Sequence, residues 1–312
     1  MSEAFDTPLY LCGPLRSPKQ MLADQEYGGH ESIHDDKMAE NLGFRGAPIE
    51  GPTHFSQFVP LLADLWGNEW FETGCLSAHY RNAVVEGEEV RAFVERPGDD
   101  QTLVQIRAEK SDGTEVLIGT ASIGSDPPES ELERRLAKLR PPEQLVILRD
   151  LEVGMRGAEI EEVRMDFDQH MGDMYPFTLN RKLEVITEST PWYTEEGGAG
   201  SPWGRAIMPL EMVSVLAGYS TGKAGFKTRG PAVGLFAGQQ IRMIKGPLFV
   251  GEDYLIDREI IALSESRRTE SNWVKTSIRQ PGSNELLAEM ILNGATLKES
   301  YANYAKELAE LA

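Results

Sequence analysis

Apolar and polar residues alternate over two long stretches of the chain, and turn residues divide each stretch into four strand-like runs. In the first half we expect strands at Cys75–Val84, Glu88–Glu95, Thr102–Lys110 and Glu115–Ile123. In the second half we expect them at about Val233–Ile244, Asp253–Leu263, Ser271–Arg279 and Glu285–Leu292. Alternation with a period of two is typical of strands that bury one face, so both halves predict antiparallel sheets.

Each strand-rich stretch follows a helix-like segment. The first segment begins after Gly51 with Pro52, which suits the first turn of a helix, while Pro60 is expected to kink or shorten it. The second segment begins at Pro209 and continues as LEMVSVLAGYS. One helix followed by four strands, repeated in the same order, indicates a duplicated unit. In each unit we expect an antiparallel sheet wrapped around the central helix.

Short matching segments support the duplication. Ala47–Pro52 aligns with Arg205–Leu210, and Val85–Val90 aligns with Phe249–Tyr254. Between the halves, two Pro-Pro pairs flank the charged stretch Ser130–Leu139, which we interpret as a connecting helix. We therefore expect an N-terminal unit at 1–125, a connector at 126–159 and a C-terminal unit at 160–312.

Composition narrows the possible partners. The 312 residues include 31 Lys and Arg against 50 Asp and Glu, a net charge of −19. The electrostatic field of this negative charge repels nucleic acids and anionic membranes, so we expect neither as a partner. A local basic patch can still bind an anionic small molecule. With only Cys12 and Cys75, no secretory signal and no apolar run of the roughly 18–20 residues that span a bilayer, a cytoplasmic protein is expected.

One segment carries a family resemblance. Ile33-His34-Asp35-Asp36-Lys37-Met38-Ala39, followed by Gly43-Phe44 and Ile49-Glu50-Gly51, resembles the MaoC-like (R)-specific enoyl-CoA hydratases and dehydratases. The resemblance implies an α+β tandem, or double, hotdog fold. It also implies an acyl-CoA thioester as substrate, without a metal or redox cofactor.

The segment departs from the family pattern at the positions that matter most for catalysis. The family's catalytic Asp stands five residues before its His, where this chain has Gly29. The family's Asn and Pro positions are Glu31 and Ser32, and the His of its His-Gly element is Glu50. The chain therefore keeps one member of the catalytic pair and lacks the other at its usual place.

The resemblance nominates a small set of catalytic residues. His34 is the candidate base, and the backbone N–H of Gly51 is the candidate oxyanion donor at the start of the central helix. Glu31 or Glu50 is the candidate substitute for the missing Asp. The competing interpretations are structural: His34 as a capping or packing residue, Gly51 as a helix-start glycine, and both glutamates as solvated carboxylates. Asp36 is interpreted as a structural cap of the short helix Asp35–Leu42.

The second copy lacks equivalent groups. Pro209, which has no N–H, stands at the position of Gly51, and Trp192 or Tyr193 stands at that of His34. We therefore expect the C-terminal half to be catalytically silent. His30-Glu31-Ser32-Ile33-His34 also matches the His-Glu-x-x-His zinc signature, but Gly28-Gly29 argues against the long helix that this signature needs, so no metal is expected.

Basic and aromatic residues of the second half are candidates for substrate binding. Trp203, Arg205, Arg242 and Lys245 are the primary candidates. Other members of the same groups are Lys223, Lys227, Arg229, Trp192, Tyr193 and Phe226. The basic group would bind the phosphates of coenzyme A, and the aromatic group would line an acyl pocket; a solvated basic face and an aromatic core are the competing interpretations.

We interpret the chain as an enzyme of the hydro-lyase type, a hydratase or dehydratase of an enoyl-CoA or 3-hydroxyacyl-CoA thioester. Two alternatives stay open because the catalytic Asp is missing: an acyl-CoA thioesterase and a non-catalytic binder of acyl-CoA or another small ligand. Pairing with a second copy as a homodimer also stays open, because a sheet with one buried face leaves free edges.

Overall fold

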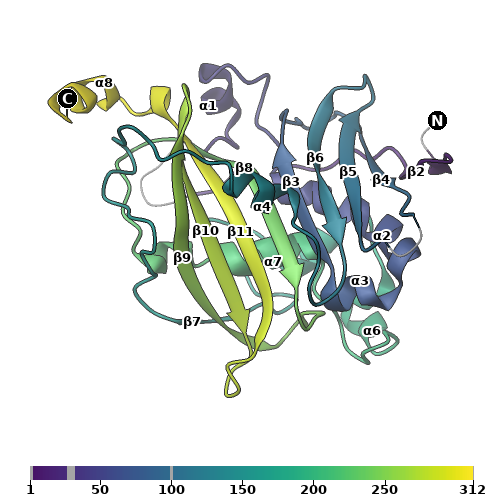
Figure 1. The fold of residues 1–312 in the computed structure, drawn as a ribbon. Coiled ribbons are helices and arrows are strands. Elements are labelled where there is room, and N and C mark those ends of the chain that lie inside the picture. The colour runs from purple at the N-terminus through teal and green to yellow at the C-terminus, as the bar shows by residue number, and fades with distance from the viewer. Residues whose placement is uncertain (1–2, 27–31, 99–100, 312) are drawn as a thin grey trace.

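The computed structural model describes residues 3–26, 32–98 and 101–311 (Figure 1). In this described part, eleven strands form one antiparallel sheet in the order β1-β2-β4-β5-β6-β3-β8-β11-β10-β9-β7. The first half contributes β1 (Phe5–Asp6), β2 (Tyr10–Cys12), β3 (Cys75–Tyr80), β4 (Val90–Glu95), β5 (Leu103–Lys110) and β6 (Glu115–Ser122). The second half contributes β7 (Glu161–Arg164), β8 (Gly234–Met243), β9 (Asp253–Glu265), β10 (Thr269–Arg279) and β11 (Leu286–Leu297).

All eight predicted strands are present, with shifted ends. The predicted Cys75–Val84 strand was wrong beyond Tyr80, because Val84 leaves the sheet and its carbonyl accepts a hydrogen bond from the Ile49 amide at 2.6 Å. The predicted Glu285–Leu292 strand continues to Leu297, which pairs with Thr269. The short strands β1, β2 and β7 were not predicted.

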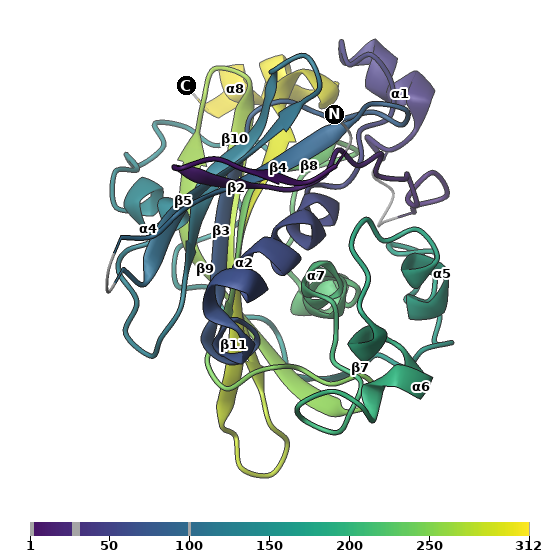
Figure 2. The ribbon, with the colours of Figure 1, turned by 90° about the vertical axis from the view of Figure 1, so that its right-hand side faces the viewer.

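The predicted central helices pack on one face of the sheet, as Figure 2 shows. The first is a 3₁₀ helix, η1 (Gly51–Phe58), followed by α2 (Val59–Trp66) and α3 (Asn68–Thr73). Pro60 lies in the first turn of α2, so it divides the segment as expected. The second is α7 (Leu210–Gly218), which contacts η1 directly. The other helical segments are α1 (Asp36–Asn41), α4 (Glu131–Leu136), α5 (Leu179–Leu183), η2 (Pro191–Tyr193), α6 (Glu195–Gly198), η3 (Thr221–Ala224), η4 (Lys298–Ser300) and α8 (Tyr304–Leu311).

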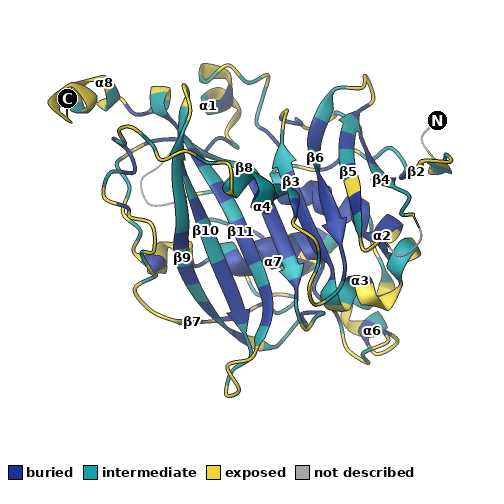
Figure 3. Cartoon of the chain, viewed as in Figure 1, coloured by how far each residue is buried: buried dark blue, intermediate teal, exposed yellow. Residues whose placement is uncertain are grey.

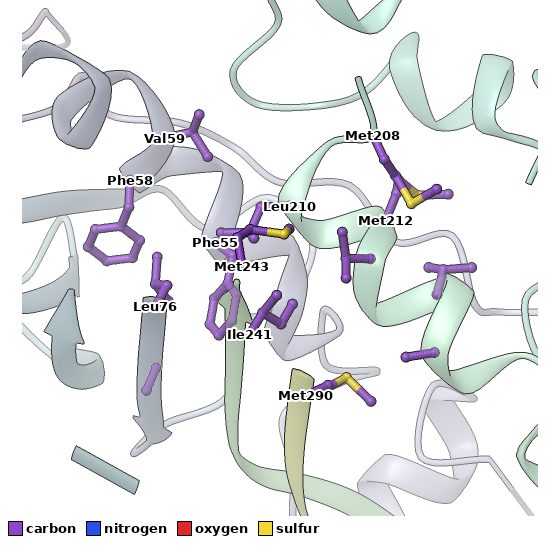
Figure 4. Packing of buried hydrophobic residues seen from close by; sticks show 14 of the residues in the cluster. Phe55, Phe58, Val59, Leu76, Met208, Leu210, Met212, Ile241, Met243 and Met290 are labelled. Atoms are coloured by element: carbon purple, nitrogen blue, oxygen red, sulfur yellow. The ribbon is translucent and has the colours of Figure 1, made fainter. Parts of the chain in front are cut away.

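The main core lies between the central helices and the middle strands, where buried residues concentrate in Figure 3. Phe55 of η1 and Met212 of α7 face Leu76 of β3 and Ile241 of β8 across this layer, as Figure 4 shows. Each is 0% exposed. Full burial of a large apolar side chain contributes about 1.5–3 kcal/mol, so this layer fixes the two helices against the sheet.

The predicted connecting helix is α4, which packs on the opposite face of the sheet from α7 (Figures 1 and 2). Ser130 caps it in a capping box with Glu133. Leu132 is fully buried against Trp273 and Ile291, and its amide donates to the Ser77 hydroxyl at 3.0 Å. The division into units 1–125 and 160–312 with a connector at 126–159 stays a prediction.

A buried ion pair ties β7, β9 and α7 together. Arg258 pairs with Glu161, and their side chains are 1% and 2% exposed. The Arg258 guanidinium also donates to the Ala217 carbonyl at 2.8 Å and to the Ser220 hydroxyl at 3.2 Å.

Removing one member of this pair should destabilise the fold strongly, because the other charge stays buried without its partner. For Glu161→Ala we expect the free energy of unfolding to fall by about 3–5 kcal/mol in urea titrations. Glu184→Ala, which removes an exposed pair with Arg181, is the matched control and should change it by roughly 0–1 kcal/mol. Equal effects in the two variants would contradict this account.

Candidate active site

His34 is held against the segment that leads into η1. Its Nδ1 lies 2.7 Å from the Pro48 carbonyl oxygen, to which the Gln20 amide also donates at 2.7 Å. Since a carbonyl only accepts, Nδ1 carries the proton in this hydrogen bond and Nε2 of the neutral ring keeps its lone pair. Burial lowers the pKa of His34 from its ordinary value of 6.5, so the ring is neutral at pH 7 and able to accept a proton at Nε2.

The neighbouring aspartates have structural roles. The Asp35 carboxylate accepts from the Met38 amide at 2.8 Å and is the N-cap of α1. The expected cap, Asp36, instead accepts from the Ala47 amide at 2.8 Å. The capping prediction was therefore one residue off, and Asp36 connects α1 to the same entry segment that His34 contacts.

Gly51 has a packing reason to be glycine. A Cβ at this position would lie 2.4 Å from Cζ of Tyr80, so the tyrosine ring covers the side where a side chain would project. Gly51 begins η1, and the first N–H groups of a helix have no partner within it. Pro209 is the N-cap of α7 and offers no such donor.

Glu50 is the N-cap of η1, but its carboxyl does not cap the helix. It is recessed between the halves and forms a hydrogen bond with the Tyr175 hydroxyl. Burial raises the pKa of Glu50 from 4.5 to about 7, with Lys182 lowering it and Glu211 raising it. The carboxyl is thus near half protonation at neutral pH, which suits a group that gives and takes a proton.

Tyr175, Lys182 and Glu211 were missed by the sequence reasoning. Glu211 did leave a signal, because it is a charged residue within the apolar run of α7 and is 2% exposed. Tyr175 lies outside the regular elements and Lys182 lies in α5, a helix of five residues that is too short for its pattern to indicate which side chains turn inward.

Trp203, one of the four substrate-binding candidates, lies away from His34. Trp203 donates to Glu72 of α3 at 3.1 Å and packs with Phe71 and Trp192, near α6. Figures 1 and 2 show α1, which His34 precedes, at the opposite end of the molecule from α6.

The three basic candidates already have polar partners. Arg205 pairs with Glu252, Lys245 pairs with Glu285, and Arg242 donates to the Ser125 carbonyl at 3.1 Å. Their binding role stays a prediction, as does the absence of a metal, because Glu31 and His30 lie outside the described residues.

The raised pKa of Glu50 makes a prediction about stability. The unfolded chain releases this proton near pH 4.5 and the folded chain near pH 7, so the folded state binds more protons between these values and stability falls as pH rises. We expect the stability of Glu50→Gln to fall less as the pH rises. The stability of this variant relative to the wild type should therefore be higher at pH 8 than at pH 4.5. Chemical denaturation across this range measures the effect, with the exposed Glu40→Gln as the control. A wild-type slope that Glu50→Gln leaves unchanged would refute the assignment.

Comparisons with known proteins identify the fold of this chain. No protein-family model and no curated protein sequence matches the chain. A protein from Chloroflexus aurantiacus assigned as a MaoC domain dehydratase matches with a TM-score of 0.60 and 14% identity, over 94% of this chain and 95% of its own. A conserved hypothetical Mycobacterium tuberculosis protein with a double hotdog fold matches with a TM-score of 0.55 and 9% identity, over 95% and 96%. This chain therefore has the double hotdog fold that is also found among MaoC-like dehydratases.

Proposed function

We propose that this protein is a hydratase or dehydratase of an acyl-CoA thioester, with its chemistry in the N-terminal half. The observation that carries the proposal is the fixed His34 ring, whose Nδ1 is bound to the Pro48 carbonyl and whose Nε2 is left as a base. Glu50 and Gly51 follow Pro48 within three residues, so the segment that the His34 ring contacts leads directly into the start of η1, which carries the proposed acid and oxyanion donor. The dehydratase assignment of a structural neighbour supports the same class of reaction.

In the hydration direction each group has one task. His34 Nε2 removes a proton from water as the water oxygen bonds to the β-carbon of the enoyl thioester. The Gly51 N–H stabilises the negative charge that develops on the thioester oxygen, and Glu50 donates its proton to the α-carbon. The product gains one hydroxyl and one hydrogen, and exchange with solvent returns the proton from His34 to Glu50.

In this proposal Glu50 takes the place of the catalytic Asp that the family resemblance leads one to expect at Gly29. Its pKa of about 7 supports the choice, because an ordinary carboxyl would hold no proton to donate at neutral pH. The second copy, with Pro209 at the equivalent helix start, is proposed to be silent. A cytoplasmic location and binding of the coenzyme A phosphates by Arg205, Arg242 and Lys245 remain proposals. Within the described residues, no helix has the length and apolar character needed to cross a membrane.

Thioester hydrolysis is the second candidate, because the same Glu50 could activate water for attack on the thioester carbonyl while Gly51 stabilises the oxyanion. A panel of enoyl-CoA and saturated acyl-CoA thioesters separates the two reactions. Loss of the conjugated enoyl absorbance reports hydration, and release of free thiol reports hydrolysis. Binding without either signal would favour a non-catalytic acyl-CoA binder.

His34→Ala should lower kcat/KM by a factor of about 10²–10⁴ on a thioester that the wild type turns over, because general base catalysis typically contributes that much. Steady-state kinetics measures the loss, and thermal unfolding checks that the fold is kept.

The matched control is His170→Ala, which removes an exposed histidine whose ring accepts a hydrogen bond from the nearby Gly172 amide. This variant should keep the wild-type rate. If His34→Ala were as active as His170→Ala, the assignment of the base would be wrong.

A further inference from the structure

Two residues of the second half form a buried ion pair that contacts η1 of the first half, the helix that follows Glu50. Lys182 of α5 and Glu211 of α7 are 2.7 Å apart, and their side chains are 5% and 2% exposed. Burying two charges is costly, and an apolar pair of similar size often stabilises a fold as well or better. Stability alone therefore does not explain a charged pair at this position.

Both members of the pair contact η1. Lys182 Nζ lies 3.3 Å from the Thr53 hydroxyl, and the Ser56 hydroxyl donates to Glu211 Oε1 at 2.7 Å. Thr53 in turn donates its backbone N–H to the Glu50 carbonyl at 3.1 Å. The pair is thus held against the first two turns of the helix whose start forms the candidate site, because Thr53 lies three residues after Glu50 and Ser56 lies six residues after it.

We propose that Lys182 and Glu211 are positioning residues that set the protonation state of Glu50 for proton transfer. The proposal rests on the proposed function, in which Glu50 is the proton donor. Burial of Glu50 favours its protonated form, Lys182 favours the carboxylate, and Glu211 opposes the effect of Lys182. Glu50 therefore keeps a proton near neutral pH, and Lys182 stabilises the carboxylate that remains after the proton has been donated.

The other titratable groups around Glu50 are neutral at pH 7. Burial raises the pKa of Tyr80 and of Tyr175 well above the ordinary value, and Glu50 itself adds to both shifts. On η1, burial lowers the pKa of His54 to about 4, with Lys182 as a second cause. Lys110 of the first half also lowers the pKa of His54. Among the described residues, the two charged groups that shift the pKa of Glu50 are Lys182 and Glu211 of the second half.

Two single variants should move the titration of Glu50 in opposite directions. Glu211→Gln leaves the Lys182 cation without its anion, so the midpoint should fall by about one pH unit or more. Lys182→Met removes the cation, so the midpoint should rise by about as much. The readouts are the pH profile of kcat/KM and the carboxyl titration followed by infrared difference spectroscopy against Glu50→Gln.

The matched controls are Arg181→Met and Glu184→Gln, an exposed pair on and next to the same helix, α5, and both should keep the wild-type midpoint. The double variant Lys182→Met/Glu211→Gln removes both charges of the pair, so it leaves no unpaired buried charge. It can be measured even if one of the single variants does not fold. Because Lys182 has the larger effect of the two on Glu50, the double variant should titrate above the wild type.

The proposal would be overturned if Glu50 titrated at the wild-type midpoint in the single and double variants. It would also be overturned if both single variants shifted this midpoint in the same direction. The infrared titration needs no turnover, so the two proposals fail separately. Opposite shifts in a protein that acts on no thioester would contradict the proposed function while supporting the electrostatic coupling. Thioester turnover without any shift would contradict the coupling alone.

Discussion

The pairing of β3 with β8 is the constraint on which the rest of the structure depends. Cys75 to His79 pair antiparallel with Arg242 to Gly238, so the two halves share one continuous sheet. Without this pairing each half would expose a strand edge in the middle of the molecule. With it, η1 and α7 lie against the same face, and their side chains are brought into contact across the duplication.

The candidate site is a product of that contact. His34, Glu50 and Gly51 come from the first half, whereas Tyr175, Lys182 and Glu211 come from the second. A carboxyl recessed between two packed halves loses its hydration, which is why the pKa of Glu50 lies so far above its ordinary value. Burial also lowers the pKa of His34, whose ring contacts Gln20 and Pro48 of the first half. Desolvation is thus the largest cause of both shifts, and it favours the neutral form of each group.

The repeated unit could be predicted from the sequence because a half-buried strand and a central helix each impose a local period on the chain. The eight main strands and the helix at Leu210–Gly218 follow from that period. The resemblance nominated His34 and Gly51 as candidates, but it did not predict the hydrogen bond between His34 and the Pro48 carbonyl. Tyr175 and Lys182 could not be predicted, because their inward orientation depends on packing between residues far apart in the sequence. Strand β7 was missed because four residues give too short a pattern, and its pairing with β9 decides its conformation.

Lys182 contacts residues that occupy equivalent positions in the two copies. Extending the match of Ala47–Pro52 with Arg205–Leu210 by one residue places Thr53 opposite Glu211, and Lys182 touches both. In a symmetric dimer of identical chains, equivalent positions must hold the same residue, so a hydroxyl on one helix and a carboxylate on the other could not coexist. Joining the copies into one chain removes that restriction, so the two helices can present different groups, a hydroxyl and a carboxylate, to a single lysine.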